Sequence, residues 1–233
     1  MKFKKMQDIY LKRNHEHYSQ DQILQINHRF NALLHKGMLT SLHLEQLWAM
    51  SEYFRSDLLY EFNNLPQEVS WNDTHIIIGN MFLESFLYQA RSLLDFYQSY
   101  ICVLLGTKTP RYMSRKKFSR AMKKSPKHFG EKPLIINEYF DEKVFIEGAW
   151  GNILKSLRDK ITHKDIIKQS YEGTEKYMQK VLLNWPTIQG KTYERLCQEI
   201  ENGYFGMIVE TSEILFDLEW KPGMVNYVNW EEN

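Results

Sequence analysis

The chain has 233 residues, of which 43% are hydrophobic and 25% are charged, and its formal net charge is +1. This composition is typical of a globular protein and excludes disorder of the whole chain. The lysine-rich first residues lack the pattern of a secretory signal, and no apolar run approaches the ~20 residues of a membrane span, so we expect a soluble, cytoplasmic protein that does not bind membranes.

Three helices are predicted in the first half of the chain, because apolar residues recur there at intervals of three and four. Their expected ranges are about 21–35, 40–63 and 72–106. Gly37, Pro66 and Gly106 are the expected stops, and Thr40 or Ser41 is the expected cap of the second helix. The third helix would be on the order of 45 Å long. A helix of that length needs partners along its whole length, so it is the expected spine of a bundle.

Three more helices are predicted in the second half. They are a short basic helix that begins near Ser114, a fifth helix at about 141–161 and a last helix at about 192–220. Between the last two, residues 165–186 alternate partly between polar and apolar side chains. A turn signal at Glu172–Gly173 makes a small β-hairpin compatible with this segment.

The whole pattern predicts an all-α fold, an up-and-down helical bundle, with that hairpin as an optional addition. Residues 1–70 would form an N-terminal helical extension that packs on a bundle of residues 71–233, and one continuous domain is the alternative. The two cysteines, Cys102 and Cys197, lie in apolar helical patterns, which is typical of buried free thiols in a reducing compartment.

Several kinds of chemistry find no motif in the sequence. It contains no glycine-rich phosphate loop, no GxSxG, no HExxH and no CxxC. The cluster of His15, Glu16 and His17 suggests no third metal ligand. We therefore expect neither a metal nor a cofactor.

A basic stretch without any acidic residue lies between Asp95 and Glu131. On the helix predicted near Ser114, charges cover all but a narrow apolar side. Such a surface concentrates polyphosphates by counterion release, which makes RNA a candidate partner. The alternative is a solvated helix that pairs with acidic surfaces elsewhere in a neutral protein. The candidate RNA-binding residues are Arg115, Lys116, Lys117, Arg120, Lys123 and Lys124.

The segment from Leu157 to His163 places an arginine near the end of an apolar helix and a histidine five residues later. A neutral imidazole can move a proton at a ribose hydroxyl or at a leaving oxygen. The guanidinium of Arg158 can bracket a phosphate as negative charge accumulates, and Asp159 can orient either partner. These three residues are the candidate catalytic group for metal-free RNA cleavage. The alternative is a surface arginine beside a histidine stabilised by the helix dipole.

This motif, together with the long helix that contains Glu84 to Asp95, resembles the HEPN superfamily of small helical bundles found in many prokaryotic RNase toxins and defence proteins. The likeness covers about residues 72–220. It implies a homodimer in which Arg158 and His163 of both chains meet in one cleft and cleave RNA. It also leaves room for an antitoxin or another protein partner.

Glu84, Arg91 and Asp95 share one face of the long helix. We interpret them as a salt-bridge network at the dimer seam, with support of the cleft as the alternative. Some toxins of this superfamily carry a regulatory tyrosine two residues after the histidine, where this chain has Asp165, so we do not expect regulation by nucleotidylation. Two further hypotheses stay open: a non-catalytic helical module that binds RNA, a nucleotide or a protein, and a structural dimerisation bundle.

Overall fold

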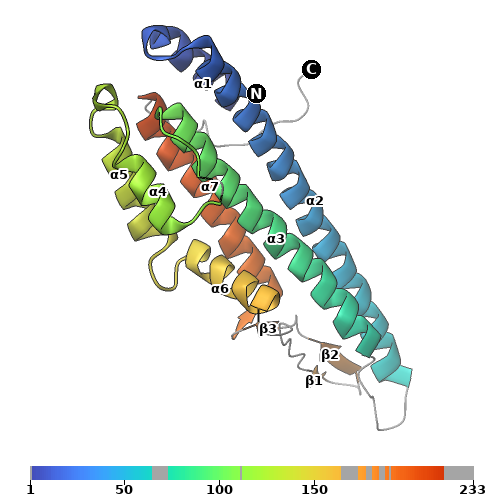
Figure 1. Cartoon of the computed structure of the whole chain (residues 1–233). Coiled ribbons are helices and arrows are strands. Elements are labelled where there is room, and N and C mark those ends of the chain that lie inside the picture. The colour runs from blue at the N-terminus through green and yellow to red at the C-terminus, as the bar shows by residue number, and fades with distance from the viewer. Residues whose placement is uncertain are drawn as a thin grey trace. The chain divides into compact units, whose positions relative to one another are not determined.

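The computed structural model describes residues 2–64, 73–110, 112–163, 173–176, 180–183, 187–188 and 190–217. This part of the chain is all-α, as predicted, with seven α-helices and only short strand pairs. The helices are α1 (Lys2–Arg13), α2 (Gln20–Asn64), α3 (Asp73–Leu104), α4 (Arg115–Met122), α5 (Lys132–Tyr139), α6 (Trp150–His163) and α7 (Tyr193–Phe216) (Figure 1). No helix within these ranges combines the length and the apolar character needed to cross a membrane.

Helix α2 is one continuous helix of 45 residues, whereas the sequence predicted two helices separated at Gly37. The predicted break was wrong, because Gly37 is not left-handed and Thr40 lies inside the helix, where its hydroxyl donates to the Lys36 carbonyl (2.9 Å). An interior glycine costs a helix only about 1 kcal/mol. Burial of apolar side chains on both sides of Gly37 offsets that cost. These side chains include Ile26, Phe30, Leu33, Leu44 and Leu47.

The fifth helix predicted at 141–161 is wrong in its first part. Helix α5, which was not predicted, leads directly into a π-helical turn, Phe140–Val144, and α6 begins only at Trp150. Gly148 lies between the π-helical turn and α6 with a φ of 81°. That left-handed conformation interrupts a right-handed helix, which explains the late start of α6.

Two antiparallel strand pairs lie between α6 and α7. They are β1 (Gly173–Lys176) with β2 (Lys180–Leu183), and β3 (Thr187–Ile188) with β4 (Lys191–Thr192). The first pair lies within 165–186, where the sequence allowed a hairpin, but both of its strands follow the predicted turn instead of flanking it. Gly173 pairs with Leu183 inside the ladder, so the turn predicted at this glycine was wrong, and residues 165–172 lie outside the described part of the chain.

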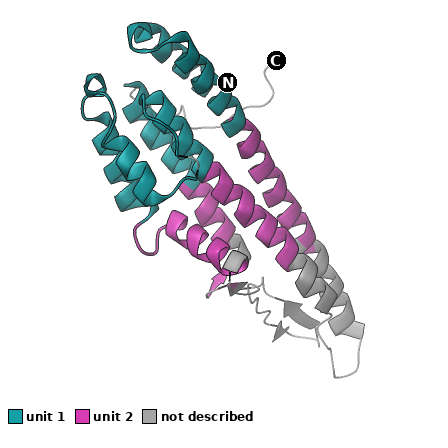
Figure 2. Ribbon diagram, in the orientation of Figure 1, with its two compact units in different colours: residues 1–33, 95–145, 204–233 teal, residues 34–94, 146–203 magenta. Residues whose placement is uncertain are grey.

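The chain divides into two compact units, shown in teal and magenta in Figure 2. Unit 1 comprises Met1–Leu33, Asp95–Phe145 and Tyr204–Asn233. Unit 2 comprises Leu34–Leu94 and Ile146–Gly203. Helices α2, α3 and α7 each contribute residues to both units, whereas α4 belongs to unit 1 and α6 to unit 2.

Aromatic rings from four helices form the core of unit 1. Phe3 of α1 stacks on Phe30 of α2 with 5.4 Å between ring centroids, and its ring meets Phe216 of α7 edge-on. Tyr100 of α3 is fully buried, and its hydroxyl donates to Oε1 of Gln7 at 3.0 Å. A buried hydroxyl is costly unless it is hydrogen-bonded, so this pair fixes α1 against α3.

Helix α3 ends in unit 1 with the glycine motif that the sequence predicted. Gly106 has a φ of 67°, its N–H donates to the Val103 carbonyl at 3.0 Å, and the N–H of Thr107 donates to the Cys102 carbonyl at 2.8 Å. These two bonds satisfy carbonyls that the helix end would leave unpaired. A Cβ at Gly106 would lie 3.1 Å from the ring of Phe129, so the glycine also permits close packing.

In unit 2, helix α6 packs on α7 where the Trp150 ring lies against Gly203. The indole of Trp150 occupies the space where a Cβ at Gly203 would lie. The α2 and α3 segments of this unit are joined by a hydrogen bond from Lys36 Nζ to Gln89 Oε1 at 3.1 Å. The buried apolar residues of α6 and α7 here include Leu154, Leu157, Leu196 and Ile200, together with the free thiol of Cys197.

Candidate functional site

Helix α4 presents the basic stretch on unit 1. Ser114 caps the helix, as predicted, because its side chain accepts a hydrogen bond from the Lys117 N–H. The ring centroids of Phe118 and Phe140 lie 4.7 Å apart, so α4 packs on the π-helical turn. The narrow apolar side of the helix is buried, and it consists of Phe118, Ala121 and Met122.

Arg115 differs from the other candidate RNA-binding residues because unit 1 itself engages its guanidinium. It forms an ion pair with Asp141, and its guanidinium carbon lies 5.6 Å from the centroid of the Phe145 ring. Burial lowers the pKa of Arg115 from its usual value. The residue therefore holds the first turn of α4 against the segment that follows α5.

The five remaining candidates are all exposed, and we call them the α4 basic surface. They are Lys116, Lys117, Arg120, Lys123 and Lys124. Within the described residues none of the five forms an ion pair with a carboxylate. Pairing with acidic surfaces, the alternative explanation of this charge, thus finds no support in the part of the chain that the structure describes.

Aromatic rings lie at both ends of this charged segment. Before α4, the Tyr112 side chain is 66% exposed, and the ammonium of Lys117 lies 5.7 Å from its ring centroid. After α4, the exposed ring of His128 stacks on His17, with 4.3 Å between centroids and an interplanar angle of 18°. Burial and the proximity of His17 both lower the pKa of His128. Sequence reasoning noted His17 only as part of the cluster with His15 and Glu16, and it missed the pair with His128 because the two histidines lie far apart in the chain.

On unit 2, helix α6 carries the proposed catalytic segment. Arg158 Nη1 donates to the carboxylate of the adjacent Asp159 at 2.8 Å, and the Arg158 side chain is 33% exposed. The helix extends to His163, two residues beyond its predicted end at about 161. Five residues rotate a helix by about 500°, which leaves the two positions about 140° apart. The side chain of His163 lies outside the described part of the chain.

The three polar residues of α3 belong to different units. Glu84 and Arg91 lie in unit 2, where Arg91 is only 9% exposed, and Asp95 lies in unit 1. Burial, followed by the negative charge of Asp95, raises the pKa of Tyr204 in α7 well above its usual value of 10. Asp95 of α3 and Tyr204 of α7 therefore lie near each other within unit 1.

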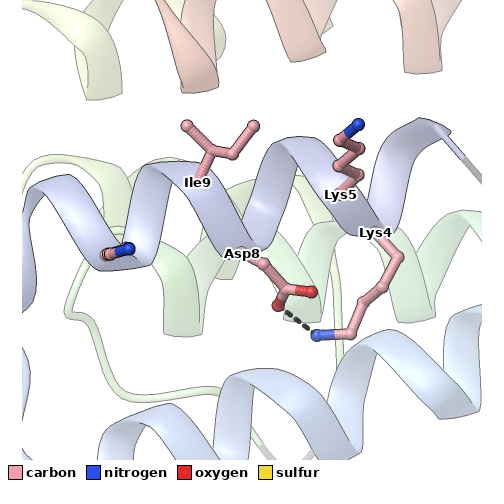
Figure 3. Close-up of a pocket in the computed structure, with 5 residues that line it drawn as sticks. Lys4, Lys5, Asp8 and Ile9 are labelled. Carbon is pink, nitrogen blue, oxygen red and sulfur yellow. Dashed lines mark hydrogen bonds and ion pairs between the residues drawn. The ribbon is translucent and has the colours of Figure 1, made fainter.

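Helix α1 lines a shallow depression of about 390 Å³ on unit 1 (Figure 3). Its side chains all come from this single helix, and Lys4 and Asp8 form an ion pair at 2.5 Å on the side away from Lys5 and Ile9. Its polar groups do not converge, so we assign no ligand to it. In the described part of the chain, no three His, Cys, Asp or Glu residues are arranged to hold a metal ion.

Comparison of the chain with models of protein families, with curated proteins and with solved structures gives no match.

Proposed function

We propose that this protein is a metal-independent endoribonuclease of the HEPN type, an up-and-down helical bundle that acts as a homodimer. RNA is bound by the α4 basic surface and cleaved by Arg158 and His163, with Asp159 orienting the arginine. The observation that carries the proposal is the charge of the α4 basic surface, whose five exposed cations lack a carboxylate partner among the described residues. When such cations neutralise the phosphates of RNA, the counterions condensed on the RNA are released, and this release favours binding.

The proposed reaction needs two proton transfers and a fixed cation. One imidazole removes the proton from a ribose 2′-hydroxyl, and the 2′-oxygen forms a bond to phosphorus. The bond from phosphorus to the 5′-oxygen breaks, and a second histidine, protonated as an imidazolium, donates a proton to that oxygen. The products are a 2′,3′-cyclic phosphate and a 5′-hydroxyl. Arg158 stabilises the charge on the phosphoryl oxygens. A dimer would supply both imidazoles from two copies of His163.

Cleavage of a labelled RNA in EDTA tests this proposal. We expect the wild-type protein to produce cyclic phosphate ends, and His163→Ala to lower the rate by about 10²- to 10⁴-fold, the usual contribution of general acid–base catalysis. Arg158→Ala should have an effect of similar size. Circular dichroism should show that both variants keep their helices. Full activity in a protein that carries both substitutions would exclude this function.

A second candidate is a non-catalytic helical module that binds RNA. It is favoured by the bond between Arg158 and Asp159, because a guanidinium held by its neighbour is less available to a phosphate. In that case His163→Ala would leave RNA binding unchanged, and no cleavage would be seen in EDTA.

A charge-matched pair of variants tests the role of the α4 basic surface in either case. One variant replaces Lys116, Lys117, Arg120 and Lys123 by glutamine. The control replaces the same number of exposed lysines elsewhere, namely Lys5, Lys12, Lys143 and Lys155. The first should lose most of its RNA affinity and much of the salt dependence of binding, and the control should lose much less. Equal losses would show that net charge alone is responsible.

A further inference from the structure

Helix α2 presents an apolar face to solvent. Leu24 is 66% exposed, Met38 is 63% exposed and Leu42 is 47% exposed. Because a helix turns by about 100° per residue, these three side chains lie within about 40° of one another around α2. They belong to one continuous helix, so their common face follows from the helical repeat alone. Large apolar side chains that gather on one exposed face are typical of an interaction surface.

The same face carries no charged side chain over about five helical turns. We call it the α2 outer stripe, and its exposed members are Leu24, His28, Asn31, His35, Met38 and Leu42. Between Asp21 and Glu45, α2 contains only two charged residues, Arg29 and Lys36. Both lie more than about 100° from Leu24 around the helix, so they belong to other sides of α2. The solvated face of a surface helix is normally charged, so this stripe is suited to contact with protein.

The order of side chains along the α2 outer stripe makes it complementary to a second copy of itself. In an antiparallel pair with its twofold axis at position 33, Leu24 of each helix lies opposite Leu42 of the other. Nearer the axis, Asn31 lies opposite His35, and an amide and an imidazole can form a hydrogen bond. A parallel pair would instead place each histidine against the same histidine, and two protonated rings repel each other. The antiparallel arrangement is therefore favoured.

The absence of charge favours a second copy as the partner of this face. A partner with charged contact residues would find no opposite charge on the stripe, whereas two neutral copies meet without repulsion. In the antiparallel pair, Asp21 and Glu45 lie opposite each other at the two exposed ends. Salt screens their repulsion, so this contact should strengthen as the salt concentration rises. RNA binding by the α4 basic surface should weaken under the same change.

We infer that two copies of this chain associate through the α2 outer stripe, with their α2 helices antiparallel. This contact goes beyond the proposed function, because it is separate from the cleft formed by Arg158 and His163 and needs no RNA. Six side chains on one helix form a small interface, and interfaces that bury less than about 1,200 Å² are weak or transient. The association therefore increases with protein concentration.

Chemical cross-linking of introduced cysteines tests the pairing. The two natural cysteines are buried, so a short bismaleimide reacts first with thiols placed on the stripe. Leu24→Cys and Leu42→Cys proteins are treated separately and as a mixture. We expect cross-linked dimers in the mixture and few in either protein alone, because each introduced thiol lies about 27 Å along the helix from its own copy in the partner. No dimers in the mixture, or equally many in each protein alone, would overturn the antiparallel contact.

Sedimentation at increasing protein concentration measures the association itself. Leu24→Glu and Met38→Glu should each lower the association constant by about tenfold or more, because a carboxylate would be buried against an apolar partner. Leu134→Glu, at a side chain that is 55% exposed on α5, makes the same chemical change away from the stripe and should have no effect. Equal losses in all three variants would show that charge alone is responsible and would overturn the inference.

Failure of this inference is distinguishable from failure of the proposed function. If the mass of the wild-type protein does not rise with concentration, or if the rise diminishes as salt is added, association through the α2 outer stripe is wrong. RNA cleavage in EDTA is measured on the same samples and decides the proposed function by itself. Leu24→Glu should cleave RNA as the wild-type protein does, because the stripe contains none of the residues assigned to RNA.

Discussion

Two glycines of this chain have opposite roles that their sequence neighbourhoods do not reveal. Gly106 has a left-handed φ at the end of α3 and lies against Phe129, so it is required by both backbone and packing. Gly37 lies inside α2, and a Cβ there would meet nothing within 4 Å. The difference follows from the surroundings of each residue in the fold.

We expect Gly106→Ala to lower the free energy of unfolding by about 1–2 kcal/mol, the cost of a left-handed alanine. Its new methyl group would also crowd Phe129. Gly37→Ala should raise that free energy by about 0.5–1 kcal/mol, because alanine restricts the unfolded chain and favours the helix. Urea denaturation measures both changes. Equal effects of the two substitutions would contradict the assigned roles.

The histidine pair predicts a specific response to pH. Burial and His17 lower the pKa of His128 below its ordinary 6.5. The unfolded chain therefore takes up this proton at a higher pH than the folded chain. Stability should be unaffected by His128 above pH 6.5 and should decline as the pH falls from there through the folded pKa. An NMR titration of His128 should show a higher pKa in His17→Gln, and an unchanged pKa would contradict the coupling.

At the scale of elements, the contact of α6 with α7 depends on the absence of a side chain. Gly203→Ala would place a methyl group in the space of the Trp150 ring, and overpacking of this kind costs about 1–3 kcal/mol. Gly206→Ala is the matched control on the same helix, because its Cβ would lie 3.8 Å from the nearest heavy atom, Glu210 Oε1. Thermal unfolding of both variants distinguishes them, and similar melting temperatures would show that Trp150 can move aside.

Helix existence was easier to predict than helix boundaries, and the reason is physical. Apolar periodicity reports burial, so it located the segments that became α2, α3, α4 and α7. Boundaries depend on backbone angles at single residues, which periodicity does not report. Gly106 adopts a left-handed φ and ends α3, Gly148 adopts one and delays α6, and Gly37 remains helical.

At the scale of the whole molecule, the proposed chemistry requires two chains. Positions 158 and 163 lie about 140° apart around α6, so within one chain they belong to different faces of the helix. We expect sedimentation to give twice the mass of one chain. An excess of His163→Ala protein mixed with wild-type protein should abolish most of the cleavage after subunit exchange, because a mixed dimer holds only one of the two imidazoles that the proposed reaction needs. Cleavage by a strictly monomeric protein would contradict this arrangement.

The candidate residues were only partly predictable from the sequence. The basic stretch and its buried apolar side could be predicted from the sequence, because charge and periodicity are local properties. The engagement of Arg115 by Asp141 and the stacking of His17 on His128 were not. These contacts join residues distant in the chain, and no local pattern encodes such pairs.

By itself, the sequence determined that this chain is helical and that one of its helices is strongly basic. It also placed Arg158 near the end of a predicted helix, and only the structure showed that this helix extends to His163. The tertiary structure alone decided that Arg115 pairs with Asp141 and that the Trp150 indole packs on Gly203. It also decided which aromatic rings lie beside the basic helix. The reason is that helical periodicity and charge are set within a few residues, whereas ion pairs, ring stacking and close packing depend on which surfaces the fold brings together.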